Sequence, residues 1–348
     1  MRRAALLAMA LVLTACGSSS ADTASGDQNT GSGAASPSEV PITPVASDWS
    51  HLESLDSLVV ADTELEAGWP LQWTAVSQGS LWLPNYEGKP PSVGRLDVET
   101  MELQATIDLD SKNDQFPPDA TGIFASDEGI WVTLAAQQAV GLIDPATNEL
   151  VRRIKVDATP YGLAVQGTDL WIADLEDHQV LRFDTVSGKE LARLPMVSPY
   201  EIAATRDAVW VSRYDLGNIA RIDPNTNEVV DEIEIGGTPG VTLGLGSVWA
   251  RARDSKLIKR IDPATNEVVA EIPMPSNVYD VEIAGDSVWA AVGPLRGECD
   301  DNSQVFRIDP TTNELDGWLD VPCAFSLATD GHRLWANSTG GILTINAE

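Results

Sequence analysis

Two stretches of this chain repeat one pattern at an interval of 39 residues: VWVSRYDLGNIARIDPNTNE at 209–228 and VWARARDSKLIKRIDPATNE at 248–267. Each begins with a tryptophan beside β-branched or small residues and ends in an Asp-Pro-Xaa-Thr-Asn-Glu turn. The tryptophan recurs at spacings of 49, 40, 39, 39, 40 and 46 residues, as Trp82, Trp131, Trp171, Trp210, Trp249, Trp289 and Trp335. A period of about 40 residues, made of short β-rich runs, is typical of a β-propeller with about four strands per blade.

The second half of each repeat predicts a tight turn between two strands. In the Asp-Pro-Xaa-Thr-Asn segment, proline sets φ at the second turn position, and asparagine tolerates the left-handed conformation. Each aspartate stands alone at its turn, so we expect it to cap the backbone rather than to bind a metal. The repeated tryptophans are large rings at one structural position, and we expect them to fill the core between blades.

The two ends of the repeat array predict how the ring closes. Seven tryptophan strands are present, but only six are followed by two further strands, because the chain ends after the apolar run at 341–345. The run Leu-Val-Val-Ala at 58–61 can supply the missing strand. The sequence therefore predicts an all-β, seven-bladed β-propeller of four-stranded blades over 49–348, closed by an N-terminal strand that completes the last blade.

The N-terminus has the pattern of an export signal. Arg2 and Arg3 precede an apolar run over 4–15 that is too short to span a bilayer. The run ends Leu-Thr-Ala-Cys, which resembles a bacterial lipobox. This resemblance implies a signal peptide over 1–15 and a lipidated Cys16 that anchors an exported protein to the extracytoplasmic face of the cell membrane. An ordinary secretory signal with a coincidental cysteine is the alternative. Residues 16–48 then form a Gly-, Ser- and Ala-rich disordered tether.

The repeat also resembles two known groups, the YVTN-type propellers and the streptogramin-lyase-like (virginiamycin B lyase) propellers. The residues that carry the resemblance are the Leu-Trp-Val strand, the Arg-Ile-Asp-Pro-Xaa-Thr-Asn-Glu turn and TPYGLAV at 159–165. The resemblance covers roughly residues 55–348 and implies the fold. The lyases of this group use a catalytic histidine with acidic magnesium ligands, and that set cannot be placed here residue by residue.

The charge excludes some classes of partner. The chain has 52 acidic residues against 22 Lys and Arg, a net charge of -30. Binding nucleic acid or anionic lipid through a basic patch needs clustered Lys and Arg, so we expect neither. Sixteen of the acidic residues lie in the repeated turns, and we expect these on the face away from the site described next.

Aromatic and charged residues recur where the loops of one face should meet. The segments that lead into the innermost strands carry aromatic side chains, two of them followed by a carboxylate, and the loops after the second strands carry polar and charged residues on the same face. Together they predict a cleft for a small molecule or a peptide, although the rings could instead pack between blades and the charges could be solvated. The predicted ligand-binding residues are Trp73, Asn85, Tyr161, Asp174, Tyr200, Glu201, Arg213, Arg253, Tyr279, Asp280 and Phe325.

Catalysis and cofactors have little support in the sequence. His178 is the one histidine near the predicted cleft and the only candidate catalytic residue; its acidic loop is more often simply solvated. No metal site and no cofactor are predicted, with Mg²⁺ needed only if the chain is a lyase. Cys299 and Cys323 are an even pair in an exported domain, on loops that should share a face, so we expect a disulfide between them.

The sequence therefore predicts a monomeric, membrane-anchored, extracytoplasmic β-propeller lipoprotein. It would bind a small molecule, a peptide or a protein partner at the mouth of its central channel, without catalysis. Two alternatives stay open: a metal-dependent lyase or hydrolase like the streptogramin lyases, and a structural scaffold of the cell envelope.

Overall fold

The computed structural model describes residues 51–64, 73–85, 90–111, 119–294, 303–338 and 341–348. Within these residues the strands form seven sheets, which confirms the predicted seven-bladed β-propeller. Three short 3-10 turns complete the described secondary structure: η1 (Asp56–Leu58), η2 (Ala135–Gln137) and η3 (Arg253–Ser255). None of the described helices is long and apolar enough to span a membrane. The predicted signal peptide, tether and lipidation site Cys16 lie outside the described residues.

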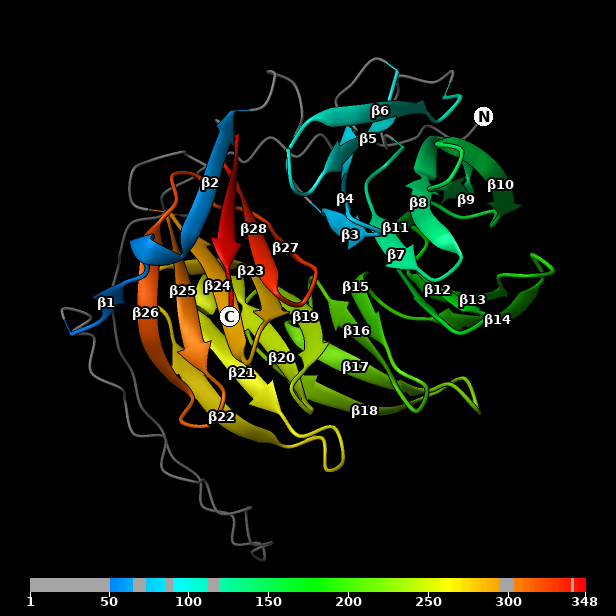
Figure 1. The fold of residues 1–348 in the computed structure, drawn as a ribbon. Helices are drawn as coiled ribbons and strands as arrows, with labels where there is room; N and C mark the ends of the chain where they lie inside the picture. The colour runs from blue at the N-terminus through cyan, green and yellow to red at the C-terminus, as the bar shows by residue number, and fades with distance from the viewer. Residues whose placement is uncertain (1–50, 65–72, 86–89, 112–118, 295–302, 339–340) are drawn as a thin grey trace, which may run out of the picture. The chain divides into compact units, whose positions relative to one another are not determined.

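The four strands of each of blades 1 to 6 pair in sequence order (Figure 1). Blades 1 to 3 consist of β3 (Ala75–Ser77), β4 (Ser80–Asn85), β5 (Ser92–Asp97) and β6 (Leu103–Asp108); β7 (Ile123–Ser126), β8 (Gly129–Leu134), β9 (Ala139–Asp144) and β10 (Glu149–Lys155); and β11 (Pro160–Gln166), β12 (Asp169–Asp174), β13 (Gln179–Asp184) and β14 (Glu190–Pro195).

Blades 4 to 6 follow the same order, and blade 7 takes its fourth strand from the N-terminal side. Their strands are β15 (Pro199–Ala204), β16 (Val209–Arg213), β17 (Asn218–Asp223) and β18 (Glu228–Glu234); β19 (Pro239–Gly244), β20 (Ser247–Ala252), β21 (Leu257–Ile261) and β22 (Val268–Pro273); β23 (Asn277–Ala284), β24 (Ser287–Gly293), β25 (Gln304–Asp309) and β26 (Glu314–Asp320); and β27 (Leu327–Thr329), β28 (Arg333–Ser338), β29 (Gly341–Asn346) and β2 (Val59–Glu64).

Strand β2 closes the ring as predicted. It pairs antiparallel with β29, from Val59 opposite Ile345 to Glu64 opposite Gly341, and Figure 1 shows it in blue beside the red C-terminal strands. The first strands of successive blades contact one another around the axis, including β27 with β3. A further short strand that the sequence did not predict, β1 (Glu53–Ser54), adds to the outer edge of blade 6 in parallel with β26.

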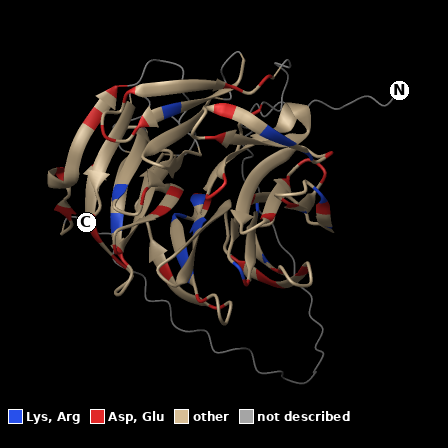
Figure 2. Ribbon diagram, turned by 45° about the vertical axis from the view of Figure 1, so that its right-hand side comes forward, with Lys and Arg blue, Asp and Glu red and all other residues tan. Residues whose placement is uncertain are grey.

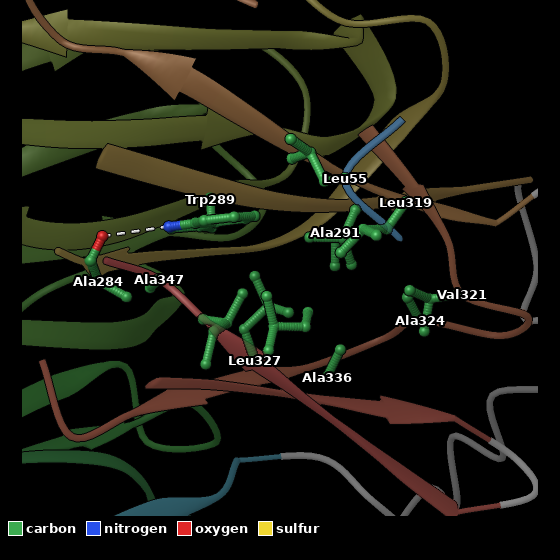
Figure 3. Close-up of a cluster of buried hydrophobic side chains, with 13 residues drawn as sticks. Leu55, Ala284, Trp289, Ala291, Leu319, Val321, Ala324, Leu327, Ala336 and Ala347 are labelled. Carbon is green, nitrogen blue, oxygen red and sulfur yellow. Dashed lines mark hydrogen bonds between the residues drawn. The ribbon is translucent and has the colours of Figure 1, made fainter. Parts of the chain in front are cut away.

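The repeated tryptophans form the core, also as predicted. All seven are at most 1% exposed, because each ring lies in the apolar layer between two blades. Figure 3 shows one such layer, in which Trp289 packs with Ala291, Leu319 and Leu327. The indole Nε1–H of Trp289 donates to the backbone oxygen of Ala284 over 3.1 Å, so its one polar group is satisfied inside the core.

The repeated arginines connect neighbouring blades, a role that the sequence did not predict. Arg182 of β13 stacks over Trp171 of its own blade, 5.1 Å from the ring centroid. Its Nη1 then reaches the next blade and donates to the backbone oxygen of Pro224 and to Asn227 Oδ1. Equivalent bonds join Arg95 to Asn148, Arg221 to Asn266 and Arg260 to Asn313.

The turn chemistry explains where the acidic residues lie. The turn asparagines are left-handed, with φ between 58° and 63°, at Asn148, Asn227, Asn266 and Asn313. The turn aspartates cap backbone N–H groups; Asp262, for example, accepts from Ala264. These turns lie at the end of the blade opposite to Tyr161. In blade 3, Asp184 begins the turn and pairs with Asp169 at one end of β12. Pro160, next to Tyr161, pairs with Asp174 at the other end of β12. Figure 2 shows many of the acidic residues at turns and strand ends.

Candidate functional site

The channel is hollowed into a cavity of about 400 Å³ that opens where the first strands begin and runs along them, from Trp73 and Phe325 to Ala125 and Thr329. This volume is in the range of small-molecule sites. The first strand of every blade contributes to the wall, together with Arg251 of β20 and Arg253 of η3. Eight of the residues that the sequence placed at the channel mouth lie in this wall: Trp73, Tyr161, Tyr200, Glu201, Arg253, Tyr279, Asp280 and Phe325.

Trp73, Tyr161 and Tyr200 form the larger aromatic cluster of the cavity. The Trp73 ring is 5.2 Å from Tyr161 and 6.2 Å from Tyr200, and the two tyrosine rings are 4.9 Å apart. Trp73 precedes blade 1, whereas the tyrosines belong to blades 3 and 4, so the indole reaches past blade 2. Its backbone φ is 52°, an uncommon and strained value for an aromatic residue.

Tyr279 and Phe325 form a second aromatic cluster, from blades 6 and 7. Their rings meet edge-on with centroids 5.1 Å apart. The Arg253 guanidinium lies over the Tyr279 ring, 4.8 Å from its centroid. The two clusters therefore present aromatic surfaces from different blades to one cavity.

Glycine allows the first strands to approach one another closely at this end. A Cβ at Gly162 would lie 2.1 Å from the backbone oxygen of Tyr200, and one at Gly122 would lie 2.3 Å from that of Tyr161. No side chain fits in that space. The glycine in the motif TPYGLAV is therefore required by the packing of one blade against the next.

A buried ion pair between blades 4 and 5 forms part of the cavity wall. Arg251 is 8% exposed, and its Nη1 donates to Glu201 Oε2 over 2.8 Å while Nη2 donates to Oε1. The guanidinium occupies the space that a Cβ at position 240 would take, 1.3 Å from Nη1, so Gly240 makes room for it. Burial lowers the pKa of Arg251, but the Glu201 carboxylate outweighs this and the net pKa lies above its ordinary value.

Asp280 and Glu282 are two more carboxyl groups of the cavity wall, both on β23. Burial raises the pKa of Asp280 to about 6, although Arg251 and the Leu327 N–H favour its charged form. Burial and the nearby Asp280 carboxylate raise the pKa of Glu282 to about 8. Near pH 7 Asp280 is therefore ionised, whereas Glu282 keeps its proton and can donate a hydrogen bond.

Three of the predicted ligand-binding residues and His178 do not line the cavity. Asp174 is fully buried and accepts from Gln179 Nε2 over 2.7 Å. Arg213 pairs with Glu232 over 2.7 Å. Asn85 ends β4, outside the cavity wall. The exposed His178 accepts the Ser198 N–H at Nδ1 over 3.2 Å, a contact that joins the loop of His178 to the segment between β14 and β15.

Parity along the second strand explains why Arg213 lies elsewhere. Side chains alternate between the two faces of a strand. Ser212 and Arg251 both stand two residues after a repeated tryptophan, and both contact Glu201. Arg213 stands three residues after Trp210, on the opposite face. The ligand-binding residues predicted from the sequence did not include Arg251 and Glu282. The position of Arg251, two residues after a repeated tryptophan, is the signal that could have identified it.

The described residues include one of the two cysteines predicted to form a disulfide. Cys323 is buried and takes part in a disulfide. Cys299 lies outside the described residues, so the Cys299–Cys323 pairing stays a prediction. Over the described ranges, no group of three or more His, Cys, Asp or Glu side chains is arranged to hold a metal ion.

Known proteins share the fold of this chain and little of its sequence. No protein family matches the sequence, and no curated protein does. Among solved structures, a chain of the Mitotic Checkpoint Complex has a TM-score of 0.68 at 13% identity, covering 87% of this chain and 99% of that one. The Cps50 (Swd1) β-propeller domain of Myceliophteria thermophila gives 0.65 at 15%, covering 83% and 99%. Kuenenia stuttgartiensis hydrazine synthase gives 0.63 at 14%, covering 82% and 98%. These likenesses define the chain as a seven-bladed β-propeller.

Proposed function

We propose that this protein is a membrane-anchored extracytoplasmic β-propeller that binds a small molecule, peptide or protein partner at the channel-mouth face, without catalysis. The observation that carries the proposal is the cavity of about 400 Å³ walled by two aromatic clusters from different blades. Aromatic walls with a few polar groups are typical of ligand sites. The strained backbone of Trp73 at the same place supports this, because such strain is often kept at ligand-binding positions.

The fold also suits a binding role. Propellers with the same architecture include a chain of the Mitotic Checkpoint Complex, which is an assembly of proteins. A rigid ring holds side chains from several blades at one place without needing a large conformational change, so less free energy is lost on binding.

Binding can be tested by thermal shift and calorimetry on the full-length protein with a panel of small molecules and short peptides. Ligands that raise the melting temperature should lose affinity in Trp73→Ala and in Phe325→Ala, two residues of the cavity wall. Tyr214→Ala is the matched control, because Tyr214 touches Tyr200 but does not line the cavity. If no compound binds while a defined protein partner co-purifies, the protein is a scaffold and the cavity is not its site.

The membrane anchor needs a separate test. We expect the full-length protein expressed in bacteria to partition into the detergent phase of a Triton X-114 extraction, and Cys16→Ser to remain in the aqueous phase. Equal partitioning of the two proteins would contradict lipidation at Cys16.

The disulfide can be tested on the same preparation. Peptide mapping of the non-reduced protein should recover the peptides of Cys299 and Cys323 joined to each other. Recovery of Cys323 joined to another cysteine would overturn the proposed pairing.

A further inference from the structure

The charged residues of the cavity wall differ in how far their charge is already balanced. Glu201 and Arg251 neutralise each other in a two-bond ion pair. The Asp280 carboxylate accepts the N–H groups of Val281 and Leu327 and the hydroxyl of Ser326, over 2.8 to 3.2 Å. Glu282 carries no charge near neutral pH, because burial and Asp280 raise its pKa to about 8. Glu201 is therefore paired and Glu282 is neutral, whereas Asp280 keeps a negative charge that three hydrogen bonds stabilise.

Arg253 is different. Unlike Arg251, it forms no ion pair with any residue that the structure describes. The buried Nε–H groups of both arginines lack an acceptor. The guanidinium of Arg253 lies against the face of Tyr279, 4.8 Å from its centroid; a ring face attracts a cation but does not accept the planar N–H fork of a guanidinium. A carboxylate matches that fork with two parallel hydrogen bonds.

The surfaces beside Arg253 are flat and apolar. Tyr279 and Phe325 lie on its own side of the cavity, and the cluster of Trp73, Tyr161 and Tyr200 also lines the wall. Offset or edge-on contact with these rings favours a planar, conjugated body in the ligand.

We propose that the cavity binds an aromatic carboxylate, with the carboxylate on Arg253 and the ring against the aromatic clusters. This inference rests on the proposed function, because it names the class of ligand for the same cavity. The neutral Glu282 supplies a hydrogen-bond donor to a polar atom of the ligand without repelling its charge.

Binding of such an anion should weaken at alkaline pH. The charged groups that act on Glu282 are Asp280 on its own strand and Glu201 of β15, and Glu201 is already paired with Arg251 of β20. When Glu282 loses its proton above about pH 8, the cavity gains a negative charge that repels the ligand. A cationic ligand would show the opposite pH dependence.

Three matched probes test the charge requirement by calorimetry on the full-length protein: 2-naphthylacetate, 2-naphthylacetamide and 2-(2-naphthyl)ethylamine. They share one aromatic body and carry a negative, no and a positive charge. We expect the acetate to bind at least about tenfold more tightly than the amide, the size of effect of a charge-assisted hydrogen bond. Arg253→Gln should abolish this preference, and Arg253→Lys should restore part of it.

Two controls separate local from general effects. Arg206→Gln removes the same charge from an exposed turn after β15, at the other end of the blade, and should leave the preference unchanged. Glu282→Gln cannot titrate, so the ratio between its affinities for the acetate at pH 7 and at pH 9 should stay close to one, whatever its absolute affinity, whereas the wild type should bind more weakly at pH 9.

The possible failures are distinguishable. If the amide or the amine binds as tightly as the acetate, the cavity takes aromatic ligands and the proposed function stands, but the inference of an anion is wrong. If no probe binds, the inference is wrong as well, and the compound panel decides the proposed function independently.

Discussion

The guanidinium of Arg251 on β20 donates to both carboxylate oxygens of Glu201 on β15, across the boundary between blades 5 and 4. The two residues are 50 positions apart in the sequence. Their pairing is possible because position 240, directly beside the guanidinium, is a glycine. The wall of the candidate site is therefore held together by a contact between blades rather than within one.

Removing one member of this pair should destabilise the ring. Glu201→Gln leaves the buried Arg251 charge without its partner, and the expected loss is about 3–5 kcal/mol of unfolding free energy. Arg251→Gln should cost a similar amount, and the double variant should cost clearly less than the sum. Urea denaturation of the four proteins gives the coupling energy; additive losses would show that the pair contributes nothing specific.

Closure of the ring should depend on Gly341. A Cβ there would lie 2.0 Å from the backbone oxygen of Thr63 on β2, so Gly341→Ala must push the two closing strands apart. We expect a loss of about 1–3 kcal/mol, measured by denaturant unfolding. Asn346→Ala, an exposed position on the same strand, should have little effect.

A deletion tests the same closure more severely. Removing residues 341–348 takes away β29 and leaves β2 without its partner. The shortened protein should not show a cooperative melting transition. A cooperative transition near the temperature of the intact chain would mean that the other blades form a stable ring without β29.

Stability should depend on pH through Glu282. Its pKa is raised from 4.5 to about 8 in the folded protein, so between these values the folded state holds a proton that the unfolded state has released. The contribution of Glu282 to stability is therefore full below about pH 4.5 and is lost as pH rises through about 8.

The matched comparison is with Glu282→Gln, which cannot titrate. From pH 5 to pH 8 the unfolding free energy of the wild type should fall relative to that of the variant by more than about 1 kcal/mol. Parallel curves for the two proteins would show that Glu282 has an ordinary pKa.

The arginine bridges between blades should contribute measurably to stability. Arg182 pairs with Trp171 in blade 3, and the equivalent residue in blade 2, which pairs with Trp131, is Leu142. Arg182→Leu therefore introduces a residue that the fold already accepts at this position. The variant loses the bonds to Pro224 and Asn227 and leaves Asp169 without its partner, which is 2.6 Å away in the wild type. We expect a loss of about 2 kcal/mol, against no measurable loss for Arg206→Gln on the exposed surface.

The fold and its closure could be predicted because they follow from local, repeated chemistry. Trp171 and its equivalents recur at one position of each blade. Asn227 and its equivalents mark the left-handed turn residue. The last blade lacked a fourth strand after the run at 341–345, and this implied the N-terminal partner strand that is found at Val59–Glu64. Each of these signals lies within one repeat or in the count of repeats.

The composition of the cavity depended on the tertiary structure. The sequence placed Tyr161, Tyr200, Tyr279 and Phe325 at the mouth, because each stands ten residues before the tryptophan of its repeat. It also placed Arg213 there, which parity directs to Glu232 instead, and it omitted Arg251 and Glu282.

The physical reason is the range over which each property is set. Strand alternation, turn φ values and burial of a ring follow from a few neighbouring residues, and repetition makes them visible in the sequence. Pairing of Glu201 with Arg251, the raised pKa values of Asp280 and Glu282, and the uncompensated charge of Arg253 arise where side chains of different blades meet. Such contacts depend on distances across the channel, and only the closed ring determines those distances.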